Sequence, residues 1–199
     1  MEELKMVSNK LYFTKMSDNF RNIPAEAEKV AAFNELSHKK MLRLRLLAEE
    51  LIGMMSQLVQ YGDGEFWIEN KGEKYELHIK LINKETVDRE KLLSVSSTGK
   101  NAAAKGIMGK LICAVEYMID ERSKVADAQY DFYGMGMMQY GDYAAWSLMN
   151  YRNNVDEASN EEAWDELEKS IIANLSDDVV VGIIGQNINV IVKKDLSKI

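Results

Sequence analysis

The chain has 199 residues, of which 46% are hydrophobic and 29% are charged, and its formal net charge is −7. These values are typical of a globular protein with one large domain or two small ones. The negative charge argues against general nucleic-acid binding, which depends on neutralising phosphates with lysine and arginine.

The cellular compartment is predicted from three features. Residues 1–17 are too charged to contain the apolar core of a secretory signal. No window reaches the roughly 18 apolar residues that a membrane span requires. Cys113 is the single cysteine and lies in an apolar run, so we expect a buried thiol in a reducing compartment. We therefore expect a cytoplasmic protein without membrane contact.

The N-terminal third predicts one strand and two helices. Residues 4–14 have the pattern of a strand, and Pro24 suits the first turn of a helix from Ala25 to about Ser37. The strongest pattern lies at 40–60, where apolar residues recur at helical spacing. They are Leu44, Leu47, Leu51, Met55 and Leu58. Glycines at 62 and 64 end this helix.

The middle of the chain predicts a β-hairpin, a loop and a helix. Polar and apolar residues alternate over 65–70 and 74–83, with the turn at Lys71-Gly72. Residues 84–105 are polar and rich in turn formers, so we expect a loop. A helix is predicted from about Gly106 to Glu121.

The last third begins with a segment rich in tyrosine, methionine and glycine, at about 122–153. We interpret it as an insertion in a single domain that spans 1–199, and two roles stay open for it, ordinary core or an adaptable contact surface. An acidic helix is expected at 156–175, with Asn154, Ser159 or Asn160 as its N-cap. A second hairpin closes the chain around Gly185-Gln186.

This order of elements resembles the GHKL superfamily of histidine kinases, anti-sigma-factor kinases and related ATPases. The resemblance covers roughly residues 10–120 and the last hairpin. It implies an α+β two-layer sandwich, with a mixed, mostly antiparallel sheet covered by helices. In that family the long helix carries a Glu followed four residues later by an Asn. Glu50 falls on the first position, as a general base, and Met54 replaces the Mg²⁺-binding Asn.

Two further motifs of the family have partial matches. The residue that binds the adenine amino group corresponds to Asn83, and Glu85 stands where the family has a glycine. The glycine turn beneath the phosphates corresponds to Gly106 and Gly109, followed by Lys110. A glycine turn at a helix N-terminus suits anions, because free N–H groups and the helix dipole point at them. Met54 disfavours Mg²⁺, which prefers hard oxygen ligands.

Each of these residues also has a purely structural interpretation. Glu50 lies between apolar neighbours, which would raise its pKa and suit a base, but a salt bridge with Arg43 or Arg45 is the alternative. The two glycines of the third motif also suit tight packing. We expect no metal site, because neither His38 nor His78 has a cysteine or carboxylate at ligand spacing.

Three functions follow as hypotheses. The first is a regulatory protein similar to anti-sigma kinases, which binds a protein partner and has weakened or lost Mg-ATP use; a stable copurifying partner would support it. The second is an active ATP-binding kinase or ATPase, which fails if Glu50→Gln leaves activity unchanged. The third is a self-associating structural protein or homodimer, which a monomer in light scattering at high concentration would exclude.

Overall fold

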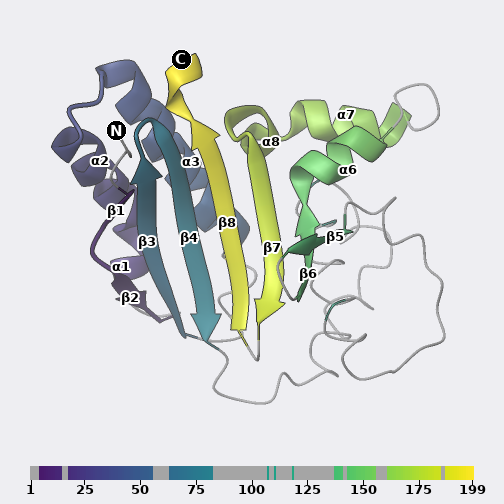
Figure 1. Cartoon of the computed structure of the whole chain (residues 1–199), viewed down its shortest axis with the longest axis horizontal. Helices are drawn as coiled ribbons and strands as arrows, with labels where there is room; N and C mark the ends of the chain where they lie inside the picture. The colour runs from purple at the N-terminus through teal and green to yellow at the C-terminus, as the bar shows by residue number, and fades with distance from the viewer. Residues whose placement is uncertain are drawn as a thin grey trace.

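A computed structural model describes residues 5–14, 18–55, 63–82, 107, 110, 118, 137–140, 143–155, 161–184 and 187–199. Its centre is an eight-stranded sheet with the order β1-β3-β4-β8-β7-β6-β5, in which β2 also pairs with β3. Every strand pairing in the described residues is antiparallel. Helices α2 and α3 lie behind β3, β4 and β8 (Figure 1). The expected α+β class is thus confirmed.

The predicted first strand is present but interrupted. Strands β1 (Lys5–Val7) and β2 (Leu11–Phe13) pair with opposite ends of β3. Between them the Ser8 hydroxyl accepts a hydrogen bond from the Ile68 N–H at 2.9 Å, while the Ser8 N–H donates to the Ile68 carbonyl at 2.8 Å. The two hydrogen bonds of Ser8 therefore continue the pairing with β3 between the two short strands.

Two helices follow the short N-terminal strands. Helix α1 (Asp18–Arg21) precedes α2 (Ile23–Phe33), which starts two residues before the predicted helix and has Pro24 in its first turn. The α2 helix ends at a left-handed residue, Glu35, with φ of 53°. The N–H of Leu36 then donates to the Ala31 carbonyl at 3.0 Å, which satisfies a carbonyl of the last turn.

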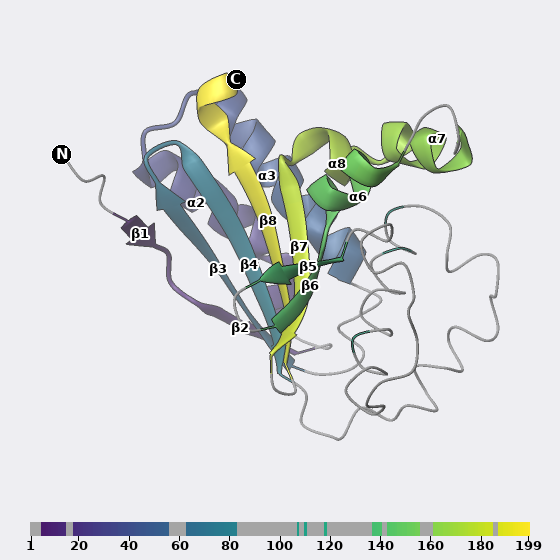
Figure 2. The same ribbon diagram turned by 45° about the vertical axis from the view of Figure 1, so that its right-hand side comes forward.

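The predicted long helix is α3 (His38–Met55). Its stripe residues Leu44, Leu47 and Leu51 are completely buried. They belong to one hydrophobic core with α2 and with alternate residues of the sheet strands. Figure 2 shows α2 and α3 on the same side of the sheet. Helical periodicity on one element and strand alternation on the other therefore meet in a single core.

Both predicted hairpins are confirmed. Strands β3 (Asp63–Lys71) and β4 (Lys74–Ile82) join through the two-residue turn Gly72-Glu73, one residue later than the predicted turn at Lys71-Gly72. Gly72 has a φ of 56°. Glycine adopts this left-handed conformation without steric cost, as tight hairpin turns require. Strands β7 (Asp178–Ile184) and β8 (Asn187–Asp195) form the C-terminal hairpin, and β8 pairs with β4 along its whole length.

The segment interpreted as an insertion contributes to this same sheet. Strands β5 (Met137–Tyr140) and β6 (Tyr143–Ser147) extend it beyond β7, and α6 (Leu148–Asn154) follows directly. The Ser147 hydroxyl caps α6 by accepting from the Asn150 N–H. The predicted single acidic helix is in fact two, α7 (Glu161–Lys169) and α8 (Ile171–Leu175), since Ser170 caps a new helix. Asn154 ends α6 and is not the N-cap of the acidic helix, and residues 156–160 lie outside the described part.

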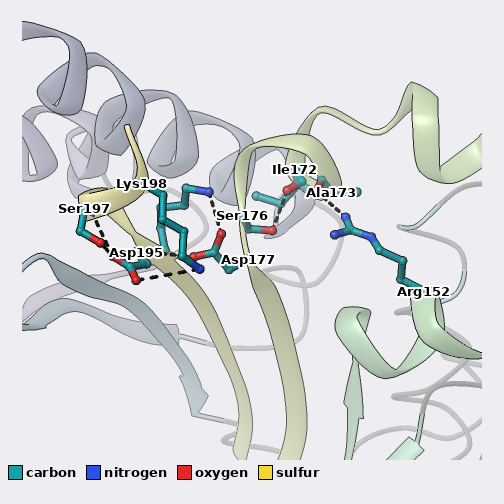
Figure 3. Close-up of polar contacts among 9 residues, drawn as sticks. Arg152, Ile172, Ala173, Ser176, Asp177, Asp195, Ser197 and Lys198 are labelled. Atoms are coloured by element: carbon teal, nitrogen blue, oxygen red, sulfur yellow. Dashed lines mark hydrogen bonds and ion pairs between the residues drawn. The ribbon is translucent and has the colours of Figure 1, made fainter.

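A polar corner joins α8 to the ends of β7 and β8 (Figure 3). The Asp177 carboxylate accepts from Lys194 Nζ at 2.7 Å and from the Asp195 N–H at 2.6 Å. Arg152 on α6 donates to the Ala173 carbonyl at 2.6 Å. The chain ends in a short 3-10 helix, η2 (Leu196–Lys198), above this corner. None of the helices in the described ranges combines the length and hydropathy of a membrane span.

Candidate functional site

The residues predicted for nucleotide chemistry are only partly described. Glu50 is half-buried near the end of α3, and Met54 lies one helical turn later. Arg45, one proposed salt-bridge partner of Glu50, pairs with Glu49 at 2.8 Å instead, and with Glu28. Among the described residues no ion pair involves Glu50.

Only three residues of the glycine motif and its predicted helix are described. Ile107, Lys110 and Met118 are helical, as predicted for 106–121. Ile107 and Met118 are buried in the same core as α3, and Lys110 is half-buried. Four predicted site residues lie outside the described part of the chain, namely Asn83, Glu85, Gly106 and Gly109. The structure thus gives backbone context for Glu50, Met54 and Lys110 alone.

A second candidate site lies on the other side of the sheet. Alternate residues of β3 and β4 point away from the helices, and we call the surface they form the open face. It consists of Glu65, Trp67, Glu69, Glu76, His78 and Lys80. No helix among the described elements covers this face in Figure 1.

The centre of the open face is a compact group of three side chains. One ligand atom each from Glu69, Glu76 and His78 lies within 4.8 Å of the other two. His78 Nε2 is 3.6 Å from Glu69 Oε2 and 3.2 Å from Glu76 Oε2. It is a buried atom and forms no hydrogen bond with any described residue. The imidazole Nε2 therefore lies close to two carboxylates without a hydrogen bond to either.

Two neighbours fix the geometry of this group. The Trp67 ring stacks on the His78 ring, with centroids 4.8 Å apart and planes 7° from parallel. Trp67 Nε1 also donates to Glu69 Oε1 at 3.0 Å. Lys5 Nζ lies 2.6 Å from the other oxygen of Glu69. The tryptophan therefore orients both an imidazole and a carboxylate, while the lysine supplies an exposed counter-charge.

The pKa shifts follow from this environment. Burial lowers the pKa of His78 below its usual value, although Glu69 and Glu76 act in the opposite direction. Burial is also the strongest influence on Glu69 and opposes its ionisation. Hydrogen bonds from Lys5 and Trp67 outweigh it and hold the pKa of Glu69 below its usual value, helped by the charge of Lys5 and, in acid where the imidazole is protonated, by that of His78. A neutral imidazole thus faces an ionised carboxylate near pH 7.

The sequence analysis missed this group because it searched for ligands along the chain. A two-residue turn at 72–73 pairs each residue with the one at equal distance from the turn. It therefore places Glu69 opposite Glu76 and Trp67 opposite His78, as the register has it. Strand alternation then puts Glu76 and His78 on one face. The sequence prediction put the turn one residue earlier, at Lys71-Gly72, and so did not give this register.

A groove forms a third candidate site, at the sheet edge between β1 and α2. Its volume is about 400 Å³. Its wall combines polar residues with apolar ones, and two of the apolar ones, Val7 and Phe33, are 55% and 75% exposed. Glu26 and Asn70 are buried polar residues of its wall. The sequence analysis did not identify this groove, since its wall combines residues 6–9, 26–34 and 70.

Comparison with known proteins adds no family to these observations. No protein-family model matches the chain, and no curated protein matches it. The geometry of the described residues is therefore the basis for the functional proposals.

Proposed function

We propose that this protein is a regulatory protein on a histidine-kinase-like ATPase fold of the GHKL type, which binds a protein partner and has weakened or lost use of Mg-ATP. Three features support the fold assignment. Helices α2 and α3 cover one face of an antiparallel sheet. The C-terminal strand β8 pairs with β4 in the middle of that sheet. Ile107 and Met118, which follow the predicted loop, are helical and buried in the same core.

The observation that carries the loss of Mg-ATP use is the arrangement at the end of α3. Glu50, the residue at the general-base position, is half-buried and joins no ion pair among the described residues. Met54 follows it by one turn on a continuous helix, so the position of the metal ligand is kept but carries a thioether. Mg²⁺ binds hard oxygen ligands and is poorly served by sulfur.

A thermal shift with ATP and ADP, with and without Mg²⁺, tests this part of the proposal. A ligand at a hundredfold excess over Kd adds about 2.7 kcal/mol to stability. For a chain of this size that corresponds to a rise in Tm of roughly 5–11 °C. We expect no Mg²⁺-dependent rise of this kind. A clear rise that requires Mg²⁺ would show that the site works despite Met54.

The contact with a partner is assigned to the groove beside β1. This strand ends the strand order, so its outer backbone edge offers hydrogen-bonding groups to an added strand. Val7 and Phe33 expose apolar surface beside that edge. The Glu26 side chain lies in the wall with 11% exposure and pairs with Lys29 at 3.2 Å, but Lys29 is 74% exposed and can give way to another cation at small cost. The chain is acidic overall. We infer an extended segment of the partner, with apolar side chains and a lysine or arginine directed toward Glu26.

Site-specific photo-crosslinking in the native cells tests this contact. A photoreactive phenylalanine analogue is placed at position 33, and at position 171 as a control. Ile171 on α8 is also an exposed apolar residue, at 56%. We expect a discrete product with one other protein from position 33 alone, mapped by mass spectrometry to a basic extended segment. A product of twice the mass of this chain would indicate self-association instead. Equal products from both positions, or none, would contradict the assignment.

Lys110 favours a second candidate, an active ATP-binding enzyme. Its half-buried, helical position would place a positive charge near bound phosphates in the GHKL arrangement. In that case purified protein should hydrolyse ATP, and Glu50→Gln should reduce kcat by about 10²–10⁴-fold, the usual contribution of a general base. Hydrolysis that is equal in wild type and Glu50→Gln would remove this candidate.

A further inference from the structure

The open face contains a buried nitrogen that the proposed function does not use. His78 is 9% exposed, and its Nε2 atom forms no hydrogen bond with any described residue. Leaving a buried polar atom unpaired costs about 1–3 kcal/mol. The atom lies close to both Glu69 and Glu76, with one carboxylate oxygen of each within 3.6 Å. A ligand that contacts the imidazole and both carboxylates together would satisfy this nitrogen.

The separations between the donor atoms identify that partner. Zinc bonds to His nitrogen and carboxylate oxygen of about 2.0–2.2 Å place the donors of a tetrahedral site roughly 3.3–3.6 Å apart. The two distances from His78 Nε2 are 3.2 and 3.6 Å. The third pair of donors lies within 4.8 Å, and Glu76, at 39% side-chain exposure, has room to move inward. We propose that Glu69, Glu76 and His78 bind a divalent metal ion of the zinc type.

The rest of the open face supports this assignment. Metal-binding side chains are commonly oriented by further hydrogen bonds, which hold the donor atoms in place. Trp67 does this for Glu69 through Nε1, at 3.0 Å to Oε1, and leaves Oε2 directed toward His78. The ring stacking of Trp67 on His78 restricts rotation of the imidazole. Rigid strands therefore present two of the three donors, while the third is adjustable.

Lys5 acts as a competitor for the same site. Its ammonium lies 2.6 Å from Glu69 Oε2, the Glu69 oxygen that is 3.6 Å from His78 Nε2. Lys5 is a flexible side chain with 62% exposure, so it can leave at small cost. A metal ion would displace it, because both cannot occupy the same side of one oxygen. Removal of Lys5 should therefore strengthen metal binding, an effect opposite in sign to removal of a ligand.

Three protein donors leave one tetrahedral position for water or another ligand. Zinc sites with three protein ligands and an open position are those that activate water or bind exogenous groups. The nitrogen and oxygen donors suit Zn²⁺ better than Mg²⁺ or Ca²⁺, which prefer oxygen alone. The site lies on the face of the sheet opposite to α3, so it is separate from the proposed nucleotide site.

Isothermal titration of untagged, chelator-treated protein with zinc chloride tests the proposal. We expect binding of one Zn²⁺ per chain to wild type, with affinity reduced at least tenfold in His78→Gln and in Glu76→Gln. Lys5→Ala should increase the affinity by about threefold to tenfold. His38→Gln is the matched control, since His38 is the other histidine and is exposed on α3; it should bind as wild type does.

The variants also separate loss of the site from loss of the fold. Glu76 is partly exposed, so Glu76→Gln should keep the wild-type circular dichroism spectrum even if His78→Gln does not. Absence of Zn²⁺ binding by wild type would overturn the proposal. Equal affinity in wild type, Glu76→Gln and His78→Gln would overturn it too, because the metal would then bind elsewhere. Neither result depends on nucleotide or partner binding.

Discussion

The two faces of the β3–β4 hairpin are made of alternate residues on the same two strands, yet they differ in almost every physical property. The face toward the helices carries Phe66, Ile68, Leu77 and Ile79, each at most 1% exposed. The open face carries charged residues with one tryptophan and one histidine. Alternation along a strand therefore lets one hairpin hold both a core and a candidate metal site.

The two faces also differ in how much each side chain contributes to the free energy of unfolding. Full burial of one large apolar side chain contributes about 1.5–3 kcal/mol. An exposed ion pair contributes about 0–1 kcal/mol. Substitutions on the open face should therefore test chemistry with little loss of fold, whereas neighbouring residues on the helix face should do the reverse. The predictions below test this separation in order of decreasing effect.

The largest expected effect comes from adjacent residues on β4. Ile79 is 1% exposed in the core, and Lys80 points to the open face. We expect Ile79→Ala to lower the free energy of unfolding by about 2–5 kcal/mol, because it leaves a cavity. Lys80→Ala should change it by no more than about 0.5 kcal/mol. Urea unfolding measures both. Similar losses for the two variants would mean that the faces are not energetically separate.

A smaller effect is expected at Gly64, on the face of β3 that points toward the helices. A Cβ added to Gly64 would lie 2.3 Å from the ring of Phe13, which is buried at 2% exposure. Overpacking of this kind costs about 1–3 kcal/mol, so Gly64→Ala should destabilise. Gly53 on α3 has no atom within 4 Å of its added Cβ. Gly53→Ala should be neutral or stabilise by up to about 1 kcal/mol, through helix propensity.

Thermal and urea unfolding of both glycine variants give the comparison. If Gly64→Ala unfolds at the wild-type urea concentration, Phe13 must be able to move. The close approach would then be a loose contact and not a packing constraint.

The periodic parts of the fold were the predictable ones. The stripe at Leu44, Leu47 and Leu51 gave α3, and alternation with a glycine turn gave both hairpins, because local spacing alone determines which side chains face the core. The region of β5 and β6 has no such pattern. Tyr143–Ser147 becomes a strand by pairing with β7, whose residues lie more than thirty positions later. Such long-range pairing leaves little trace in local sequence.

The same distinction applies to the candidate sites. The half-buried position of Glu50 was predictable, because it lies beside apolar residues on a strongly periodic helix. The metal-site candidate needed the hairpin register, which the predicted turn at Lys71-Gly72 does not give. The groove was not predictable, because Val7 and Phe33 meet only when an edge strand packs beside a helix.

A third prediction concerns the aromatic pair on the open face. Trp67 stacks on His78 at 4.8 Å and lies under Lys10 Nζ at 4.8 Å. Such an aromatic pair contributes about 0.5–1.5 kcal/mol, so Trp67→Ala should cost about this much in chelator-containing buffer. Trp67→Phe should keep most of the stability, since it retains stacking and loses the indole N–H. A loss for Trp67→Ala as large as that for Ile79→Ala would place Trp67 in the core.

The smallest expected effect lies at the C-terminal end of β8, where Asp195 pairs with Lys74 in the sheet register. The Asp195 carboxylate accepts from the Ser197 hydroxyl and from the Ser197 N–H at 3.0 Å (Figure 3). The Ser197 side chain and backbone, followed by the charges of Lys198 and Lys74, outweigh partial desolvation and hold the pKa of Asp195 below its usual value.

Folding therefore favours the ionised form of Asp195. Its contribution to stability is present above the unfolded pKa, near the usual value of 3.8, and is lost as the pH falls through the lower folded value. Ser197→Ala removes the hydroxyl donor and should raise the pKa of Asp195 in a carbon-detected NMR titration. Stability at pH 7 should barely change, because Ser197 is exposed and water can replace its hydroxyl as a donor. An unchanged pKa would mean that the backbone N–H of Ser197, and not its hydroxyl, stabilises the ionised carboxylate.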